Sequence, residues 1–230
     1  MRDVNVQDKN IMIPIVSGLV RIKLSIYFIK YYLKVFKRSV SPSYLIWRGH
    51  GFQSPSPQFI KTQVLKRNAI KPGTWVETGT YLGDTTKFLA KNFPDSKIIS
   101  IEPQLLIFNF AKFRLRRLKN ILLINGSSED KFEETVSKLT GPVNFWLDGH
   151  FSGDITFQGA TNSPISKELE LIEKYRNNFN HLVVLIDDIR GFDGDLNSGY
   201  PSRDTVVAWA NKNNLQWNIE QDIFIAKSRK

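Results

Sequence analysis

The sequence predicts an α/β protein in which helices cover both faces of a largely parallel sheet, preceded by a helical N-terminal extension. From residue 57 onwards, short apolar runs alternate with amphipathic stretches of helical length, a pattern typical of parallel sheets. The runs 98–101 and 182–186 are almost wholly apolar, as expected for strands that are buried on both sides.

The first predicted helix covers residues 19–38. Its apolar residues recur at helical spacing along one face, and lysines follow a neighbouring stripe. The apolar residues are Ile22, Ile26, Ile29, Leu33 and Phe36, and the lysines are Lys23, Lys30, Lys34 and Lys37. Two interpretations stay open. The helix packs on the main domain or on another subunit, or it lies on an anionic membrane surface.

Residues 39–57 predict a linker, because Ser-Pro pairs and glycines disfavour regular structure. We therefore expect an N-terminal extension and linker over 1–56 and a main domain over 57–230. The expected helices of that domain are 57–69, 84–92, 104–118, 129–139, 164–178 and 202–212, and the expected strands are 74–77, 97–102, 120–125, 143–148 and 182–187. Residues 215–226 predict two more strands that form a terminal antiparallel hairpin.

The composition narrows the classes of function. With 32 Lys and Arg against 22 Asp and Glu, the net charge is +10, which favours an anionic partner. The chain has no cysteine, which excludes disulfides, thiolate metal sites and cysteine nucleophiles. The apolar stretch 11–20 is shorter than the roughly 20 residues of a membrane span, and it lacks a cleavage site. We expect no cleaved signal and no span, and a cytoplasmic protein that, in the second interpretation of residues 19–38, also contacts a membrane.

The loop after the first strand predicts a nucleotide site. Glu77, Gly79 and Gly83 are spaced acid-x-Gly-x-x-x-Gly, and glycines at a strand-to-helix turn let a ligand approach the backbone. A dinucleotide fingerprint needs glycine where this chain has Tyr81, which disfavours a nicotinamide oxidoreductase.

Two further strand ends extend this site. Glu102 ends the second strand, where a carboxylate accepts hydrogen bonds from ribose hydroxyls. The third strand ends in a polar segment, 125–130, which contains Ser127 and Ser128 and suits the edge of an adenine ring.

With this loop, this acid and the terminal hairpin, residues 74–226 resemble the class I S-adenosylmethionine-dependent methyltransferases. The resemblance implies a Rossmann-like sheet of seven strands and S-adenosylmethionine as the cofactor. It also implies that Glu77 and Gly79 face the methionine part, Glu102 the ribose, and Ser127 or Ser128 the adenine. The plainer interpretation is that Glu102 caps the next helix and Gly79 makes a turn.

Three aspartates end the next two strands, Asp148 on the fourth and Asp187 and Asp188 on the fifth. Neighbouring strands lie about 4.8 Å apart, so these carboxylates converge at the carboxyl edge of the sheet. Their repulsion calls for compensation by a cation, by protons or by strong hydrogen-bond donors, and Mg²⁺ is the economical choice because it suits oxygen ligands. A substrate hydroxyl on that ion is easier to deprotonate, and His150, which follows Asp148 in the same loop, is placed to take the proton.

The three aspartates resemble the Mg²⁺ ligands of O-methyltransferases of the macrocin and cephalosporin-biosynthesis type. That resemblance implies a metal held by Asp148, Asp187 and Asp188, and His150 as the base. Without a metal, Asp148 contacts the donor or substrate, and Asp187 or Asp188 caps a helix or pairs with Arg190. The loops that follow, 149–163 and 190–202, are expected to shape the acceptor site.

The function expected from these residues is Mg²⁺-assisted O-methylation of a sugar or another small hydroxyl substrate by a homo-oligomer. A nucleic-acid methyltransferase is one alternative, prompted by the net charge and the basic segment 112–119, although that segment also fits a solvated helix face; nucleic acid is therefore not the expected partner. The other alternative is a donor-binding or membrane-docking module without activity.

Overall fold

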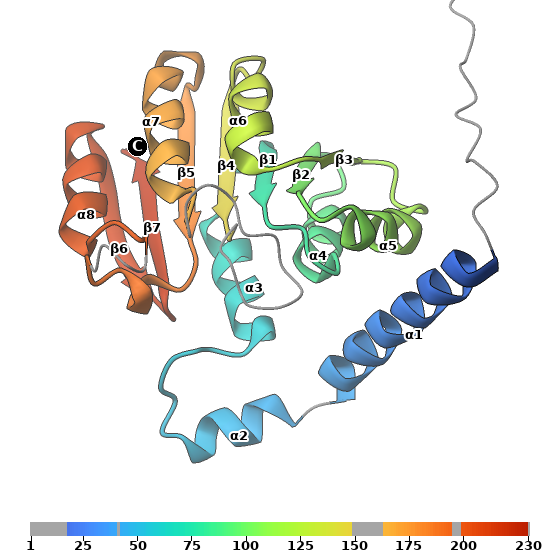
Figure 1. Cartoon of the computed structure of the whole chain (residues 1–230). Coiled ribbons are helices and arrows are strands. Elements are labelled where there is room, and N and C mark those ends of the chain that lie inside the picture. Colours follow the sequence, from blue (N-terminus) through green and yellow to red (C-terminus); the bar gives the residue numbers. More distant parts are fainter. Residues whose placement is uncertain (1–17, 41, 149–162, 195–198, 230) are drawn as a thin grey trace, which may run out of the picture. The chain divides into compact units, whose positions relative to one another are not determined.

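The computed structural model describes residues 18–40, 42–148, 163–194 and 199–229 (Figure 1). The chain divides into two compact units, one that reaches to Ser41 and one from Pro42 to Lys230. The boundary between the two units thus falls at residues 41 and 42, inside the predicted linker 39–57, and the expected division of the chain after residue 56 stays a prediction.

Helix α1, Gly18–Val40, is the regular element of the first unit, and it covers the predicted helix 19–38. Within the part of the chain that the structure describes, no helix is both long enough and apolar enough to cross a membrane.

The predicted linker contains a short helix, α2, over Ser43–Gly49. Trp47 is buried, and its indole Nε1 donates a hydrogen bond to the carbonyl of Gln53 at 2.8 Å. Its ring lies 4.9 Å from that of Phe52. Further along, the Ser56 hydroxyl donates to the Gln221 side chain at 2.8 Å. Aromatic packing and a distant hydrogen bond thus order a segment whose prolines and serines predict irregular structure.

The second unit is built on a seven-stranded sheet in the order β3-β2-β1-β4-β5-β7-β6. The first five strands are parallel to one another, and β7 runs antiparallel to both β5 and β6. The strands are β1 Thr74–Thr78, β2 Ile98–Glu102, β3 Ile121–Asn125, β4 Pro142–Leu147, β5 His181–Ile186, β6 Leu215–Glu220 and β7 Ile223–Ser228. The predicted Rossmann-like α/β sheet with a terminal antiparallel hairpin is confirmed.

Helices cover both faces of this sheet (Figure 1). The helices on one face are α6 Ser128–Val136, α7 Ile165–Lys174 and α8 Arg203–Lys212, and those on the other are α3 Gln58–Asn68, α4 Asp84–Asn92 and α5 Leu105–Leu115. Phe145 lies in the core of the first face and Trp75 and Trp146 in that of the second, all fully buried. Each such side chain contributes roughly 1.5–3 kcal/mol through its burial.

The terminal hairpin turns at Gln221 and Asp222, with φ angles of 52° and 68°. Two successive left-handed residues are typical of a type I′ turn, whose twist matches that of paired strands. The turn of the hairpin therefore lies within the segment 215–226, for which the sequence predicted an antiparallel hairpin.

Candidate active site

Backbone hydrogen bonds continue past the carboxyl ends of β1, β4 and β5. The Asp148 amide donates to the Thr78 carbonyl at 3.2 Å, and the Asp187 amide donates to the Leu147 carbonyl at 3.1 Å. Asp148 is therefore held beside the end of β1, with Asp187 in the next position across the sheet. The convergence of acids that the strand order predicts is present.

Glu77 lies at the end of β1 and is completely buried. Its Oε2 accepts hydrogen bonds from the Thr86 and Ser100 hydroxyls, both at 2.6 Å. Its Oε1 is buried as well, and it has no hydrogen-bond partner among the described residues. Burial raises the pKa of Glu77 to about 8, against the two hydroxyl hydrogen bonds. A buried carboxylate oxygen without a partner is costly, and protonation of the carboxyl lowers that cost.

Glu102 ends β2 and faces the loop that follows β1. Its Oε2 accepts from the Tyr81 amide at 2.8 Å, and its Oε1 accepts from the Gln104 amide at 3.0 Å. Burial raises its pKa, and these two N–H donors act in the opposite direction. A carboxylate has about four acceptor positions, so Glu102 keeps capacity for hydroxyl donors such as those of a ribose. Glu102 also holds the loop after β1 through Tyr81 and the start of α5 through Gln104. The second contact is close to the plainer interpretation, in which Glu102 caps the next helix.

The loop between β1 and α4 relies on left-handed backbone at three positions, with φ angles of 84° at Gly79, 48° at Tyr81 and 79° at Gly83. Gly83 is the residue that caps α4, and a Cβ atom there would lie 2.9 Å from Leu115 Cδ1. Tyr81 therefore adopts a conformation that glycine favours, at the very position where a dinucleotide fingerprint has glycine.

The two serines predicted to face adenine have structural hydrogen bonds. Ser127 is the N-cap of α6: its Oγ accepts from the Asp130 amide at 3.2 Å and donates to the Asp130 carboxylate at 2.8 Å. The Ser128 hydroxyl donates to the buried carboxylate of Glu168. Burial raises the pKa of Glu168 to about 7. The adenine role of these serines stays a prediction, and both side chains already have partners within α6 and α7.

The ammonium of Lys61, from α3, bridges the two aspartates that follow β5. Its Nζ lies 2.6 Å from Asp187 Oδ1 and 2.7 Å from Asp187 Oδ2. It also lies 2.9 Å from Asp188 Oδ1. Burial lowers the pKa of Lys61, but the attraction of the two carboxylates outweighs this effect and raises it. Lys61 is therefore a buried, charged group.

Asp187 is almost fully buried. Burial first, and then the charge of Asp148, raise its pKa to about 7 against the opposing effect of Lys61. Asp188 has a left-handed backbone, φ 53°, and its Oδ1 also accepts from Arg190 at 2.8 Å. The pairing with Arg190 that the sequence allowed for Asp188 is present.

Tyr200 comes from the loop before α8 and lies close to the same acids. Burial raises the pKa of its hydroxyl, and the charges of Asp188, Asp148 and Asp187 add to this effect. Its ring packs against Phe192 with the centroids 4.9 Å apart. The Tyr200 hydroxyl is therefore within electrostatic reach of Asp148, Asp187 and Asp188.

Mg²⁺ does not fit this arrangement. Lys61 already contacts both carboxylates of the Asp187–Asp188 pair, and within the described ranges no cluster of three acidic or imidazole side chains is arranged to hold an ion. An ammonium and a divalent cation cannot share the same carboxylate oxygens without strong repulsion. The expected metal site of Asp148, Asp187 and Asp188 is therefore not supported, because the compensating charge comes from the chain itself.

Two other predicted features have different outcomes. His150 lies outside the described residues, as does most of the loop 149–163. In the basic segment 112–119, Arg114 is largely buried, forms an ion pair with Asp84 at 2.6 Å and donates to the Leu82 carbonyl at 2.6 Å. Arg114 thus stabilises the end of the loop between β1 and α4. At least this cation of the segment 112–119 is already paired with an acid of the chain.

Sequence reasoning missed Lys61, Thr86 and Ser100 as members of the site, whereas Tyr200 lies in the loop 190–202 that was expected to shape the acceptor site. Lys61 lies 126 residues from Asp187, so no local spacing connects them. One signal was available: Lys61 interrupts an otherwise apolar helix face, on which Val64 and Leu65 are fully buried, and a lysine on a buried face needs an acidic partner.

Comparisons with solved structures give methyltransferases of low sequence identity. The chain is similar to a putative rRNA methylase from Clostridium thermocellum, with 16% identity, coverage of 74% of this chain and 94% of that one, and a TM-score of 0.49. It is similar to fibrillarin from Aeropyrum pernix with natively bound S-adenosylmethionine, with 12% identity, 74% coverage of each chain and a TM-score of 0.47.

A third similar structure is the N-terminal domain of EvdMO1 in the presence of S-adenosylhomocysteine and D-fucose. It has 11% identity, coverage of 74% of this chain and 81% of that one, and a TM-score of 0.48. No protein-family model and no curated protein sequence matches the chain. The strand order and the loop geometry, rather than these distant likenesses, define the class: a Rossmann-like α/β protein with an acid-and-glycine loop at the carboxyl edge of its sheet.

Proposed function

We propose that this chain binds S-adenosylmethionine and transfers its methyl group to a hydroxyl of a sugar or another small molecule. The observation that carries the proposal is the buried, unpartnered Oε1 of Glu77 at the end of β1. The next strand is β4, which Asp148 follows, and the one after it is β5, which Asp187 and Asp188 follow.

The donor side of the site supports this ligand through three groups. The ammonium of the methionine part provides the partner that Glu77 lacks, and it stabilises a carboxylate whose pKa is otherwise raised to about 8. The ribose hydroxyls donate to the remaining acceptor positions of Glu102. Gly79 has a left-handed backbone and no side chain, so the ligand can approach the backbone of the loop at this position.

The acceptor side supports attack by a hydroxyl. When bound, S-adenosylmethionine supplies a methyl group on a positively charged sulfur. Asp148 accepts the proton of the substrate hydroxyl while the hydroxyl oxygen bonds to the methyl carbon. The electrons of the broken carbon–sulfur bond remain on sulfur. His150, which follows Asp148, is a second candidate for the proton acceptor. Lys61 holds the carboxylates of Asp187 and Asp188 in place through its ion pairs, and Tyr200 offers a hydrogen bond to the substrate.

In this proposal the reaction needs no Mg²⁺, because the ammonium of Lys61 provides the positive charge that the aspartates require. This differs from the Mg²⁺-assisted reaction expected from the sequence.

The test combines calorimetry and a transfer assay. We expect S-adenosylhomocysteine to bind the full chain, and labelled methyl groups to pass from S-adenosylmethionine to a member of a sugar and polyol panel, with and without a chelator. A chain that binds neither compound would refute the proposal. Binding without transfer to any acceptor would favour a non-catalytic module, and strongly salt-dependent RNA binding with methylation of RNA would favour a nucleic-acid substrate.

A further inference from the structure

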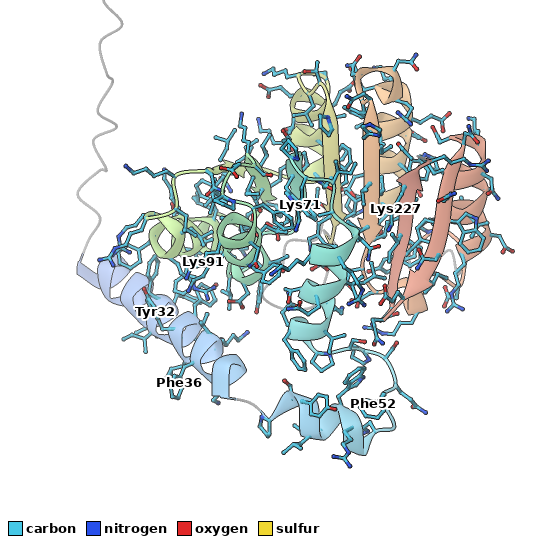
Figure 2. All side chains as sticks on the ribbon, turned by 180° about the vertical axis from the view of Figure 1, so that it is seen from behind. Tyr32, Phe36, Phe52, Lys71, Lys91 and Lys227 are labelled. Atoms are coloured by element: carbon cyan, nitrogen blue, oxygen red, sulfur yellow. The ribbon has the colours of Figure 1, made fainter. Side chains whose placement is uncertain are left out.

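Helix α1 carries a continuous row of exposed apolar side chains. Ile26, Ile29, Leu33 and Phe36 recur at helical spacing and are 59%, 59%, 54% and 63% exposed. Tyr32, beside this row, is 46% exposed, and Tyr32 and Phe36 project from the helix in Figure 2. Single exposed apolar residues are ordinary, but a row of this length marks an interaction surface.

The opposite side of the same helix is different. Tyr31 is buried, and Phe28 and Val35 are half-buried. The exposed row is thus not the only apolar side of α1, but it is the side on which each of Ile26, Ile29, Leu33 and Phe36 is more than half exposed.

The charge of α1 indicates what covers the exposed row. The helix contains six basic residues and no acid: Arg21, Lys23, Lys30, Lys34, Lys37 and Arg38. Lys30 and Lys37 are exposed and follow Ile26 and Leu33 by four residues, so each lies directly beside the apolar row. Long lysine stems run along apolar surface while the ammonium reaches a more polar layer.

The next helix in the chain, α2, repeats this composition. Leu45 and Ile46 are 64% and 52% exposed, Arg48 is the basic residue of the last turn, and the helix has no acid in its first turn. Phe52, just beyond α2, is exposed as well (Figure 2). Only residues 41 and 42 separate the two helices, so the exposed apolar and basic character extends over one stretch of sequence.

We propose that α1 docks this protein onto an anionic lipid surface, with the row Ile26, Ile29, Leu33 and Phe36 at the level of the acyl chains and Lys30 and Lys37 on the lipid phosphates. An amphipathic helix of this kind lies in the plane of the interface. A phospholipid surface provides both a continuous apolar layer and a negative potential, which together match the row and its flanking charges. The docking is independent of the proposed methyl transfer.

The experiment is co-sedimentation of the full chain with two kinds of vesicle, phosphatidylcholine alone and phosphatidylcholine mixed with phosphatidylserine. We expect binding to the mixed vesicles, weakened by salt. The triple change Ile29→Ser, Leu33→Ser and Phe36→Ser is expected to reduce that binding at least tenfold, since it removes most of the inserted apolar area. The double change Lys30→Glu and Lys37→Glu is expected to reduce it at least tenfold as well, because each cation near such a surface contributes about 1 kcal/mol, a factor of about five.

Matched controls separate docking from general surface effects. The apolar control changes three exposed apolar residues of the second unit, as Leu105→Ser, Leu122→Ser and Ile219→Ser. The charge control makes the same charge change in that unit, as Lys91→Glu and Lys119→Glu. Both controls are expected to bind vesicles as the unchanged chain does, and circular dichroism verifies that every variant is folded.

Three results would overturn the inference. The first is that the unchanged chain fails to bind mixed vesicles. The second is that the α1 variants bind these vesicles as well as the unchanged chain does. In the third, the unchanged chain is a dimer by light scattering, the apolar triple variant is a monomer, and neither binds vesicles. That outcome would assign the exposed row to contact between two copies.

Discussion

Lys61 Nζ lies 2.6 Å from Asp187 Oδ1, and both side chains are more than nine-tenths buried. Taking two charges out of water is costly, and removing one partner leaves the other uncompensated. The pair therefore fixes α3 to the end of β5 and determines how the acidic site responds to mutation, pH and metal ions.

Lys61→Met is expected to destabilise the fold by about 3–5 kcal/mol at pH 8, because Asp187 and Asp188 lose their buried counter-charge. Urea unfolding measures this loss. The loss shrinks towards pH 5, since protonation of Asp187, whose pKa is already raised by burial, removes the unpaired charge. Lys66→Met, an exposed position on the same helix, is the control and is expected to change stability by no more than about 0.5 kcal/mol. Equal effects of the two changes would mean that the Lys61–Asp187 pair contributes nothing specific.

Lys61→Ala is expected to create a response to divalent cations that the unchanged chain lacks. Without the ammonium, the carboxylates of Asp187 and Asp188 lose the counter-charge of Lys61, which Mg²⁺ or Mn²⁺ can replace in part. Thermal unfolding with and without each ion measures the response: the melting temperature of the variant rises with the ion, and that of the unchanged chain does not. Chelation is expected to leave methyl transfer by the unchanged chain intact. Loss of that activity on chelation, with recovery on addition of Mg²⁺, would restore the metal to the mechanism.

The two residues of this pair show where sequence reasoning succeeds and where it stops. Asp187 was identified as a site residue because it follows a buried strand, and local patterns determine where strands end. Its partner was missed because an ion pair between α3 and β5 depends on packing across the sheet. The same limit applies to the segment around α2, where Trp47 of the helix packs on Phe52 beyond it and orders residues that local propensity predicts as irregular.

The turn between β1 and α4 was predicted in position but only partly in detail, and its role in binding the donor stays a prediction. The spacing of Glu77, Gly79 and Gly83 is a local signal, and both glycines have the positive φ that the turn requires. Tyr81 was expected only to hinder a dinucleotide. Its left-handed backbone and its hydrogen bond to Glu102 depend on the neighbouring strand, so the loop sequence alone does not reveal them.

Binding of S-adenosylhomocysteine at pH 7 is expected to release about one proton from Glu77. The pKa of about 8 keeps the ligand-free carboxyl mostly protonated, and the ammonium of the ligand favours the ionised form. Calorimetry in two buffers of different ionisation enthalpy measures the proton count. Glu77→Gln is expected to abolish the release and to weaken binding by roughly tenfold or more, the cost of one charge-assisted hydrogen bond. Tight binding by this variant with an unchanged proton count would assign the released proton to another group.

The ligand-free stability of the unchanged chain gives a second readout for Glu77. Its pKa in the folded state, about 8, lies above the ordinary value of 4.5. Between pH 4.5 and pH 8 the folded state therefore keeps a proton on Glu77 that the unfolded state has released. The resulting contribution is complete below pH 4.5 and disappears as the pH rises towards 8. Urea midpoints across this range are expected to fall less steeply for Glu77→Gln than for the unchanged chain.

Gly83→Ala is expected to destabilise the fold more than Gly141→Ala, although both glycines have a φ of +79°. The left-handed backbone costs an alanine about 1–2 kcal/mol at either position. Only at position 83 does the new Cβ approach another side chain, 2.9 Å from Leu115 Cδ1, which adds about 1–3 kcal/mol of overpacking. Unfolding free energies of the two variants measure the difference directly. Equal losses would show that Leu115 moves aside at no cost and that α4 does not depend on this close approach.

Asp148→Asn is expected to separate chemistry from donor binding. The amide keeps the size of the side chain and its position after β4, where the backbone N–H bonds to Thr78, but it cannot accept the proton of a substrate hydroxyl. Methyl transfer is expected to fall by about 10²–10⁴, while calorimetric affinity for S-adenosylhomocysteine changes by only a few fold. Asp95→Asn, an exposed acid in the turn before β2, is expected to leave both quantities unchanged. If the transfer rate survives Asp148→Asn and is lost in His150→Gln, the proton goes to the histidine, and Asp148 acts through its charge on Asp187.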